Sequence, residues 1–457
     1  MIDLRYELNQ RPPLAKNLLY AIQWLVVVLP LVVISARLMA AFLNMDAAQA
    51  SILFQKMLLL VGLVTTVQCF RGHMYPLVDG PSAALLLSVA ALAPEGYSTV
   101  LGGMLTGGLL LFLLGAAGMV GRLTALFTGR VVGVVLILIS LTFLPFLYPM
   151  VIGKGPGRPN GDPITLAVAC IVTLAIILIS NYGKGYFKNL SILLGIVLGY
   201  GLMAAGARLD LTHVARVPFL SAPWPLFGPR PEFSFAGTVS FFMANVAVLI
   251  NGLGSFTAVA QVVGDDDLEN RVRKGVTLTG ASGILAAFTG TLGTVSYSQS
   301  PGVIMVTRVG SRYPVLLCGI LMCALSFFTR FTSVLVSVPE GVVGAALLVT
   351  LASMVGLGIS IIARERGGDS IRDHLVVGLP LMLGMSASLL PAAFLETLPA
   401  TVRGLVGSGL IVGITAVLIL EHVVLKESKI HPPSLTPTEQ LRGTGSPKSK
   451  EQKSDFG

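Results

Sequence analysis

Two carboxamide side chains, those of Asn251 and Gln299, interrupt apolar stretches in the second half of the chain. Each carboxamide offers one hydrogen-bond acceptor and two donors. Ser298 and Ser300 flank Gln299, and backbone amides near these serines add further donors. A mostly apolar surface with a few such polar groups is typical of a small-molecule site. The residue types therefore predict a site that binds a small molecule through hydrogen bonds.

Each of these residues also has a purely structural interpretation, and the sequence leaves both open. Gln299 either contacts a substrate or caps a helix, and Ser300 suits a cap equally well. Asn251 either binds a substrate or joins two membrane helices through its amide. Ser255 lies one helical turn beyond Asn251, and its hydroxyl is expected to bond back to its own helix.

Gln299 lies in a segment, residues 293–312, that cannot form an ordinary membrane helix. Residues 294–298 alternate small polar with β-branched or aromatic side chains, which predicts a short extended piece. Pro301 fits the first turn of a helix, expected over 302–309, whose free amides would point at the region of Gln299. Backbone that breaks at membrane depth is buried in protein or lines a cavity, and transporters form substrate sites in this way.

The first half of the chain contains a matching interruption in residues 71–94. Pro76, Gly80 and Pro81 break this segment, and the apolar stretch that follows ends at Pro94, too short to cross a bilayer. We expect an extended piece followed by a half-length helix here as well. Two interrupted segments, one in each half, indicate a transporter built from inverted repeats.

Asp79 stands beside this break and is the carboxylate that the sequence places nearest the membrane midplane. An acid is costly to keep charged in lipid, so Asp79 is a candidate for carrying a coupled proton. The alternative is that Asp79 caps a helix at a water-exposed end. His73 is expected at a loop edge without a partner, and Asp265 and Arg271 are expected in a solvated charged loop, residues 264–274.

The composition indicates a membrane protein with many spans. The chain has 457 residues, 54% hydrophobic and 12% charged, with a mean hydropathy of +0.83 and recurrent apolar runs. Its four cysteines lie in or beside apolar runs and are expected in the core. Because the sequence shows no catalytic set, zinc-ligand spacing or phosphate-binding loop, we expect no enzyme activity, cofactor, metal or nucleic-acid partner.

Hydropathy predicts an all-α fold of about fourteen transmembrane segments, with short extended strands before half-helices 3 and 10. With both termini inside, most lysines and arginines fall on the inner side, in agreement with the positive-inside bias. The uninterrupted segments are expected at 17–42, 50–70, 98–120, 129–150, 164–180, 189–206, 236–263, 275–291, 313–330, 341–363, 374–392 and 401–425.

The sequence resembles the nucleobase–ascorbate transporter family, also called xanthine/uracil permeases. QSPGVIMVTR, residues 299–308, resembles the family signature of Gln or Glu, Asn, any residue, Gly, four residues, Thr and Arg. Four further stretches resemble other motifs of the family and occur in the same order: PLVDGPSAALL, KNLSILLGIVLGY, SAPWPLFGPRPEF and VPEGVVGAALLVTLASMVGLGI. The similarity spans roughly residues 15–425.

The resemblance implies two inverted repeats of seven segments, a homodimer in the inner (plasma) membrane, and proton-coupled transport by movement of a core domain against a gate domain. The implied division of the chain is a cytoplasmic tail at 1–16, core parts at 17–120 and 235–330, gate parts at 121–206 and 331–425, an outer Pro-rich loop at 207–234, and a disordered cytoplasmic tail at 426–457.

Five positions depart from the family pattern. The acid of helix 8, the aspartate of helix 9, the histidine of helix 1, the signature asparagine and an aromatic residue of segment 3 correspond here to Asn251, Thr279, Trp24, Ser300 and Ala83. The usual intramembrane acids are therefore missing, which leaves Asp79 as the candidate for proton coupling.

We predict a permease for xanthine, uric acid, another purine or uracil. A nucleobase is a flat ring that needs donors and acceptors in one plane and an apolar face, and the substrate-binding candidates are Asn251, Gln299, Ser300, Ser298, Ala83 and Gln23. Gln23 is equally suited to an interhelical contact. Three alternatives stay open: an uncoupled nucleobase facilitator, an anion transporter of the same fold whose substrate would suit positive helix ends, and a receptor without transport activity.

Overall fold

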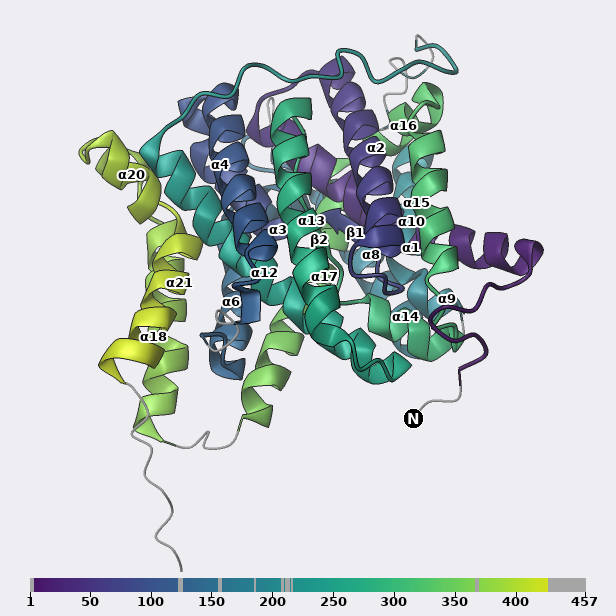
Figure 1. The fold of residues 1–457 in the computed structure, drawn as a ribbon. Helices are drawn as coiled ribbons and strands as arrows, with labels where there is room; N and C mark the ends of the chain where they lie inside the picture. The colour runs from purple at the N-terminus through teal and green to yellow at the C-terminus, as the bar shows by residue number, and fades with distance from the viewer. Residues whose placement is uncertain are drawn as a thin grey trace, which may run out of the picture.

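The computed structural model describes residues 4–121, 126–154, 158–184, 186–206, 209, 214, 217–365 and 370–425. These residues form a bundle of helices around two very short strands (Figure 1). Within the described ranges, seven helices are long and apolar enough to cross a membrane, or eight if the bent pair α15 and α16 is one span. The predicted tail over 426–457 lies outside the described residues.

The helices, with the labels of Figure 1, are α1 (Leu14–Phe42), α2 (Ala47–Arg71), α3 (Ala83–Leu92), η1 (Ala93–Glu95), α4 (Tyr97–Ala116), α6 (Gly129–Thr142), α7 (Leu144–Ile152), α8 (Pro163–Tyr182), α9 (Tyr186–Asn189), α10 (Ser191–Ala205), α12 (Phe235–Val263), α13 (Leu268–Thr289), α14 (Ser300–Thr307), α15 (Tyr313–Leu325), α16 (Thr329–Val336), α17 (Glu340–Arg364), α18 (Ile371–Ser388), α19 (Ala392–Glu396), α20 (Ala400–Val406), α21 (Gly409–Ile419) and η2 (Leu420–Val424).

The two strands, β1 (Asp79–Pro81) and β2 (Thr294–Ser296), pair antiparallel in the middle of the bundle (Figure 1). Asp79 lies opposite Ser296, and all six residues are buried. Because the strands come from the two interruptions, each supplies backbone partners that the other needs at membrane depth. Each strand is followed by a short helix, α3 or α14.

The half-helix α14 begins at Ser300, two residues earlier than expected. Pro301 causes no break because a proline in the first helical turn needs no N–H partner. Arg308 ends the helix in the left-handed conformation, with φ of 57°. The helix therefore has eight residues, far too few to span a bilayer.

Three expected segments are interrupted in the structure. The segment at 129–150 is divided at Phe143 into α6 and α7, which together still count as one of the seven spans. The segment at 401–425 is divided into α20, α21 and η2, and the one at 313–330 gives way to α15 and α16, which bend by 96°. The α15–α16 bend is stabilised from outside, because Gln55 of α2 donates to the freed carbonyl of Ser326 at 2.9 Å.

The prediction of a solvated loop at 264–274 was wrong for most of this stretch. Helix α13 begins at Leu268, so most of this stretch is helical. Arg271 is only 8% exposed, and its guanidinium lies 2.8 Å from the Asp265 carboxylate. Tyr75 also donates to Asp265 at 2.7 Å, so the charged stretch packs against the loop that follows α2.

The segment expected as an N-terminal tail packs on the protein from residue 5 onward. Arg5 N donates to the carbonyl of Arg308 at 2.8 Å, and Gly310 N donates to the carbonyl of Tyr6 at 2.9 Å. The N-terminal segment therefore lies along the end of α14 and the loop that follows it.

The close packing of α4 on α13 generates a test of the fold. A Cβ added to Gly280 of α13 would lie 2.2 Å from the backbone nitrogen of Phe112 in α4. We expect Gly280→Val to lower the free energy of unfolding by about 1–3 kcal/mol, because two backbones must separate. The midpoint of thermal unfolding in detergent measures this change.

Gly356→Val is the matched control, since Gly356 is also helical and a Cβ there meets no atom within 4 Å. Equal losses of thermal stability in the two variants would contradict the described contact of α4 with α13.

Candidate functional site

Two cavities meet beside the strand pair. The larger, about 1000 Å³, is lined partly by charged side chains, including Asp266, Glu269, Arg273 and Arg364. The smaller, about 230 Å³, lies between α1, α3, α6, α12, α17 and the residues around β2. Four residues line both cavities: Leu136, Asn251, Ser298 and Leu357. The charged cavity therefore forms an approach to the smaller, mostly apolar one.

The smaller cavity combines apolar walls with a few polar groups, as small-molecule sites do. Asn251, Ser298 and Gln299 contribute polar side chains from one side. Thr350 and Ser353 of α17 contribute hydroxyls from the other, and both hydroxyls donate to carbonyls of their own helix. The oxygen atoms of these two side chains can therefore still accept hydrogen bonds from a ligand.

Asn251 is oriented by its neighbours. Ser298 donates to its Oδ1 at 2.5 Å, so the amide N–H groups are the ones left to face a ligand. Ser255 Oγ lies 3.0 Å from Ser298 Oγ, 3.0 Å from the carbonyl of Ser296 and 2.9 Å from the carbonyl of Asn251. Ser255 thus bonds back to its own helix as expected, and it also ties α12 to β2.

The structure brings together four of the six substrate-binding candidates. Asn251, Gln299, Ser298 and Ala83 all line the smaller cavity. The side chain of Gln299 is exposed where it lines this cavity, so a ligand there could contact it.

Ser300 and Gln23 lie outside both cavities. Ser300 is buried, with its Oγ 3.5 Å from the backbone nitrogen of Val78. Gln23 lies on α1, eight residues before Leu31, which lines the smaller cavity, and this separation is about 12 Å along a helix.

Sequence reasoning missed three hydroxyl residues that line the smaller cavity, namely Ser35 of α1 and Thr350 and Ser353 of α17. Thr350 and Ser353 lie three residues apart in α17, so they share one helix face. Two hydroxyl side chains at this spacing in an otherwise apolar helix are the signal that marks them.

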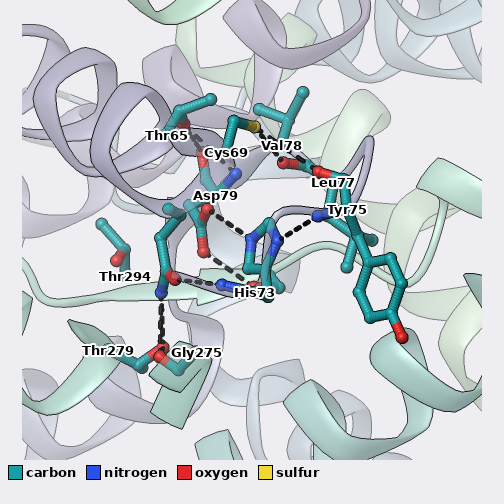
Figure 2. Close-up of polar contacts among 12 residues, drawn as sticks. Thr65, Cys69, His73, Tyr75, Leu77, Val78, Asp79, Gly275, Thr279 and Thr294 are labelled. Carbon is teal, nitrogen blue, oxygen red and sulfur yellow. Dashed lines mark hydrogen bonds and ion pairs between the residues drawn. The ribbon is translucent and has the colours of Figure 1, made fainter. Parts of the chain in front are cut away.

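Asp79 is fully buried on the far side of the strand pair, next to His73 (Figure 2). His73 Nε2 lies 3.5 Å from Asp79 Oδ2, and Ser296 donates to Asp79 Oδ1 at 2.8 Å. The expectation that His73 has no partner was therefore wrong. The loop folds back at Met74, which adopts the left-handed conformation with φ of 54°, and this turn brings the histidine to the aspartate.

Comparison with known proteins identifies the family. A family model for xanthine/uracil permeases, described as "Permease family", matches residues 15–393. The chain belongs to this family. It is therefore a permease that crosses the membrane several times, and it is a transporter rather than an enzyme.

Its curated relatives are similar over most of their lengths. The uric acid transporter UacT of Escherichia coli is 26% identical, over 83% of this chain and 80% of the relative. The uric acid permease PucJ of Bacillus subtilis is 25% identical over 85% and 88%, and the xanthine permease XanQ of Escherichia coli is 25% identical over 91% and 93%.

Solved structures of membrane transporters share the fold. The transmembrane domain of the cyanobacterial bicarbonate transporter BicA matches with a TM-score of 0.56 and 13% identity, over 88% of this chain and 96% of that one. The murine anion transporter Slc26a9, in its inward-facing state, matches with a TM-score of 0.61 and 13% identity, over 90% and 69%.

The larger cavity generates a labelling test. Thr257 is exposed in its wall, beside several charged residues that favour contact with water. In a Cys170→Ala background, which removes the exposed native thiol, we expect Thr257→Cys to react with a membrane-impermeant maleimide in vesicles of one orientation only. Ser88→Cys, at a position only 1% exposed, is the unreactive control. Equal reaction of Thr257→Cys in both vesicle orientations would contradict a cavity that opens to one side.

Proposed function

We propose that the permease carries a nucleobase, of the xanthine or uric acid type or another purine or uracil, across the membrane. The observation that supports this most is the small apolar cavity with the carboxamides of Asn251 and Gln299 in its wall. The names of the relatives, which are uric acid and xanthine permeases, support the same substrate class.

The site chemistry suits a flat ring with amide groups. Asn251 offers N–H donors, because its oxygen already accepts from Ser298. Gln299 offers a second carboxamide from the N-cap position of α14. The first-turn N–H groups of this helix, at Ser300, Gly302 and Val303, already donate to the carbonyls of Tyr297 and Gln299, so the expected free amides are not available to a ligand. Ala83 and the leucines of the wall leave an apolar slot for the ring faces. In this proposal the edge of the ring is read by the two carboxamides.

We propose an alternating-access mechanism in which a core domain moves against a gate domain. Two groups of helices support this division: α4 packs on α12 and α13 and α2 packs on α15, whereas α6 packs on α17, α18 and α21. The smaller cavity has walls from both groups, with Asn251 on one and Leu351 on the other. Movement between the groups would therefore open and close the site.

We also propose the number of segments, their internal symmetry and the arrangement of the protein in the membrane. The architecture comprises fourteen segments in two inverted repeats, which the antiparallel pairing of β1 with β2 supports, since a two-fold axis between them would relate the halves. It also comprises a homodimer in the inner membrane with both termini cytoplasmic, which the distribution of lysines and arginines supports.

Proton coupling through Asp79 is proposed as well, because an acid buried within the membrane region is a functional candidate. The rivals are an uncoupled facilitator and an anion transporter. The anion transporters among the structural neighbours are 13% identical, which indicates the fold alone. The larger cavity carries charges of both signs, so its wall gives no preference for anions.

Uptake by the purified permease in liposomes tests the substrate class. Radiolabelled uric acid, xanthine and uracil are each supplied outside, with radiolabelled bicarbonate as the anion. We expect saturable uptake of at least one nucleobase and none of bicarbonate above protein-free liposomes. Uptake of bicarbonate without any nucleobase would overturn the proposal.

Asn251→Ala and Gln299→Ala test the assigned roles. Each removes a carboxamide that the proposal places on the substrate, so we expect the KM for the transported base to rise by roughly tenfold, from a loss of about 1.4 kcal/mol. Asn245→Ala is the matched control, because Asn245 lies on the same helix but bonds to the carbonyl of Phe241 and lies outside the smaller cavity. An unchanged KM in both test variants would remove these residues from the site.

A further inference from the structure

The hydrogen bonds of His73 fix where its proton lies. The backbone N–H of Tyr75 donates to His73 Nδ1 at 3.0 Å, so this nitrogen carries no proton (Figure 2). The ring proton must then be on Nε2, which faces the carboxylate of Asp79. His73 is therefore a donor to Asp79 Oδ2, and its Nδ1 cannot take up a proton without losing the bond from Tyr75.

The other titratable and charged groups around the pair are already engaged. The Cys69 thiol faces the carbonyls of Tyr75 and Leu77, and the Tyr75 hydroxyl donates to Asp265. On the other sides, the Tyr297 hydroxyl donates to Pro81 O, Arg271 donates to the carbonyl of His73, and Arg312 donates to the carbonyl of Cys69. Of these described groups, the Asp79 carboxylate is the one that can take up a proton in place.

The strand β2 separates this pair from the substrate cavity by one layer of backbone. Val295 and Tyr297 line the smaller cavity, whereas the side chain of Ser296 between them points the other way and donates to Asp79. This alternation is the ordinary geometry of a strand. One strand thus presents a substrate face and a proton face.

Ser296 joins the two faces, its hydroxyl bonded on one side and its backbone carbonyl on the other. Asp79 Oδ1 accepts from the Ser296 hydroxyl, and the Ser296 carbonyl lies 3.0 Å from Ser255 Oγ. Ser255 Oγ lies 3.0 Å from Ser298 Oγ, and Ser298 donates to Asn251 Oδ1. Each hydroxyl can either donate or accept by rotation alone.

We propose that Asp79, held by His73, is the proton-binding site of the permease and acts on the substrate site through Ser296. The proton comes from water and adds to Asp79 Oδ1, which becomes a neutral O–H donor. The Ser296 hydroxyl must then rotate, because two hydrogens cannot lie between two oxygens. The altered bond moves Ser296 on β2, whose carbonyl holds the Ser255 hydroxyl and through it Ser298 and Asn251. This inference rests on the proposed function, since Asn251 must contact the substrate.

Burial ties this proton to the conformational change. Both His73 and Asp79 are 0% exposed, so exchange with water requires the surrounding segments to move. A proton that exchanges only when the protein changes conformation is the requirement for coupled transport.

Two transport assays in liposomes test the proposal. One measures accumulation of the transported base, driven by an inside-alkaline gradient of one pH unit, which can sustain about tenfold accumulation with one proton per substrate. The other measures exchange of labelled for unlabelled base without a gradient. We expect Asp79→Asn to abolish accumulation and to retain exchange within about threefold, because exchange needs no net proton movement. Glu232→Gln, at an exposed acid, is the control that retains both.

Two substitutions of His73 separate its contacts. His73→Gln retains an N–H donor near the position of Nε2, whereas His73→Asn retains an acceptor for Tyr75 and loses the donor to Asp79. Losing that donor disfavours the carboxylate, so the proton binds at a higher pH. We expect His73→Asn to move the pH profile of exchange upward by on the order of one unit and His73→Gln to leave it in place.

The outcomes distinguish a failure of the proposed proton site from a failure of the proposed nucleobase transport. Accumulation by Asp79→Asn equal to wild type, or a wild-type protein that only equilibrates the base whatever the gradient, would overturn the proton site and leave nucleobase transport standing. No movement of any base by wild type in either assay would instead overturn the proposed function. If Asp79→Asn does not fold, the His73 pair decides, since a purely structural role would lower the rates without moving the pH profile.

Discussion

The pairing of β1 with β2 is the interaction on which the rest of this structure depends. A chain that leaves the helical conformation inside a membrane must find partners for its N–H and C=O groups within the protein, because hydrocarbon offers none. Here the two interruptions satisfy each other, with Asp79–Pro81 against Thr294–Ser296. Pro81 has no N–H, and the pairing ends there with Ser82 N donating to the carbonyl of Gly293. Neither half of the chain can form this site alone.

The same pairing explains why the polar chemistry of the protein gathers in one place. The antiparallel register sets Asp79 opposite Ser296, and the strand alternation then turns Ser296 toward the aspartate while Val295 and Tyr297 face the cavity. Helix α14 starts four residues after β2, so Gln299 is held at the cavity wall by both elements. A shift of the register by one residue would exchange the two faces and separate the aspartate from its serine.

The sequence predicted where the two interruptions lie, but not the contacts that the structure forms around them. Prolines, glycines and the alternation at 294–298 mark the two interruptions, and the family signature places Gln299 beside them. The sequence could not predict the partner of Asp79. His73 contacts Asp79 only because the chain makes a left-handed turn at Met74 and two distant strands pair. The α15–α16 bend could not be predicted either, because the freed carbonyl of Ser326 accepts from Gln55, more than 250 residues away in the sequence. Local patterns carry no information about such contacts.

In the proposed mechanism the proton-binding acid lies behind β2 rather than at position 251, and this changes how a bound proton could act on the substrate. The smaller cavity holds no charged side chain among its described lining residues, so a charge in its wall cannot act on a ligand there directly. In the proposed coupling, the Ser296 hydroxyl reverses by rotation, and the Ser296 carbonyl connects this change to the hydroxyls of Ser255 and Ser298 beside Asn251. One such bond contributes about 0.5–1.5 kcal/mol, which corresponds to a change in affinity of up to about tenfold. This lies at the low end of couplings between sites in proteins, about 1–3 kcal/mol, so a change in the bond between Ser296 and Asp79 is sufficient for the proposed coupling to have moderate strength.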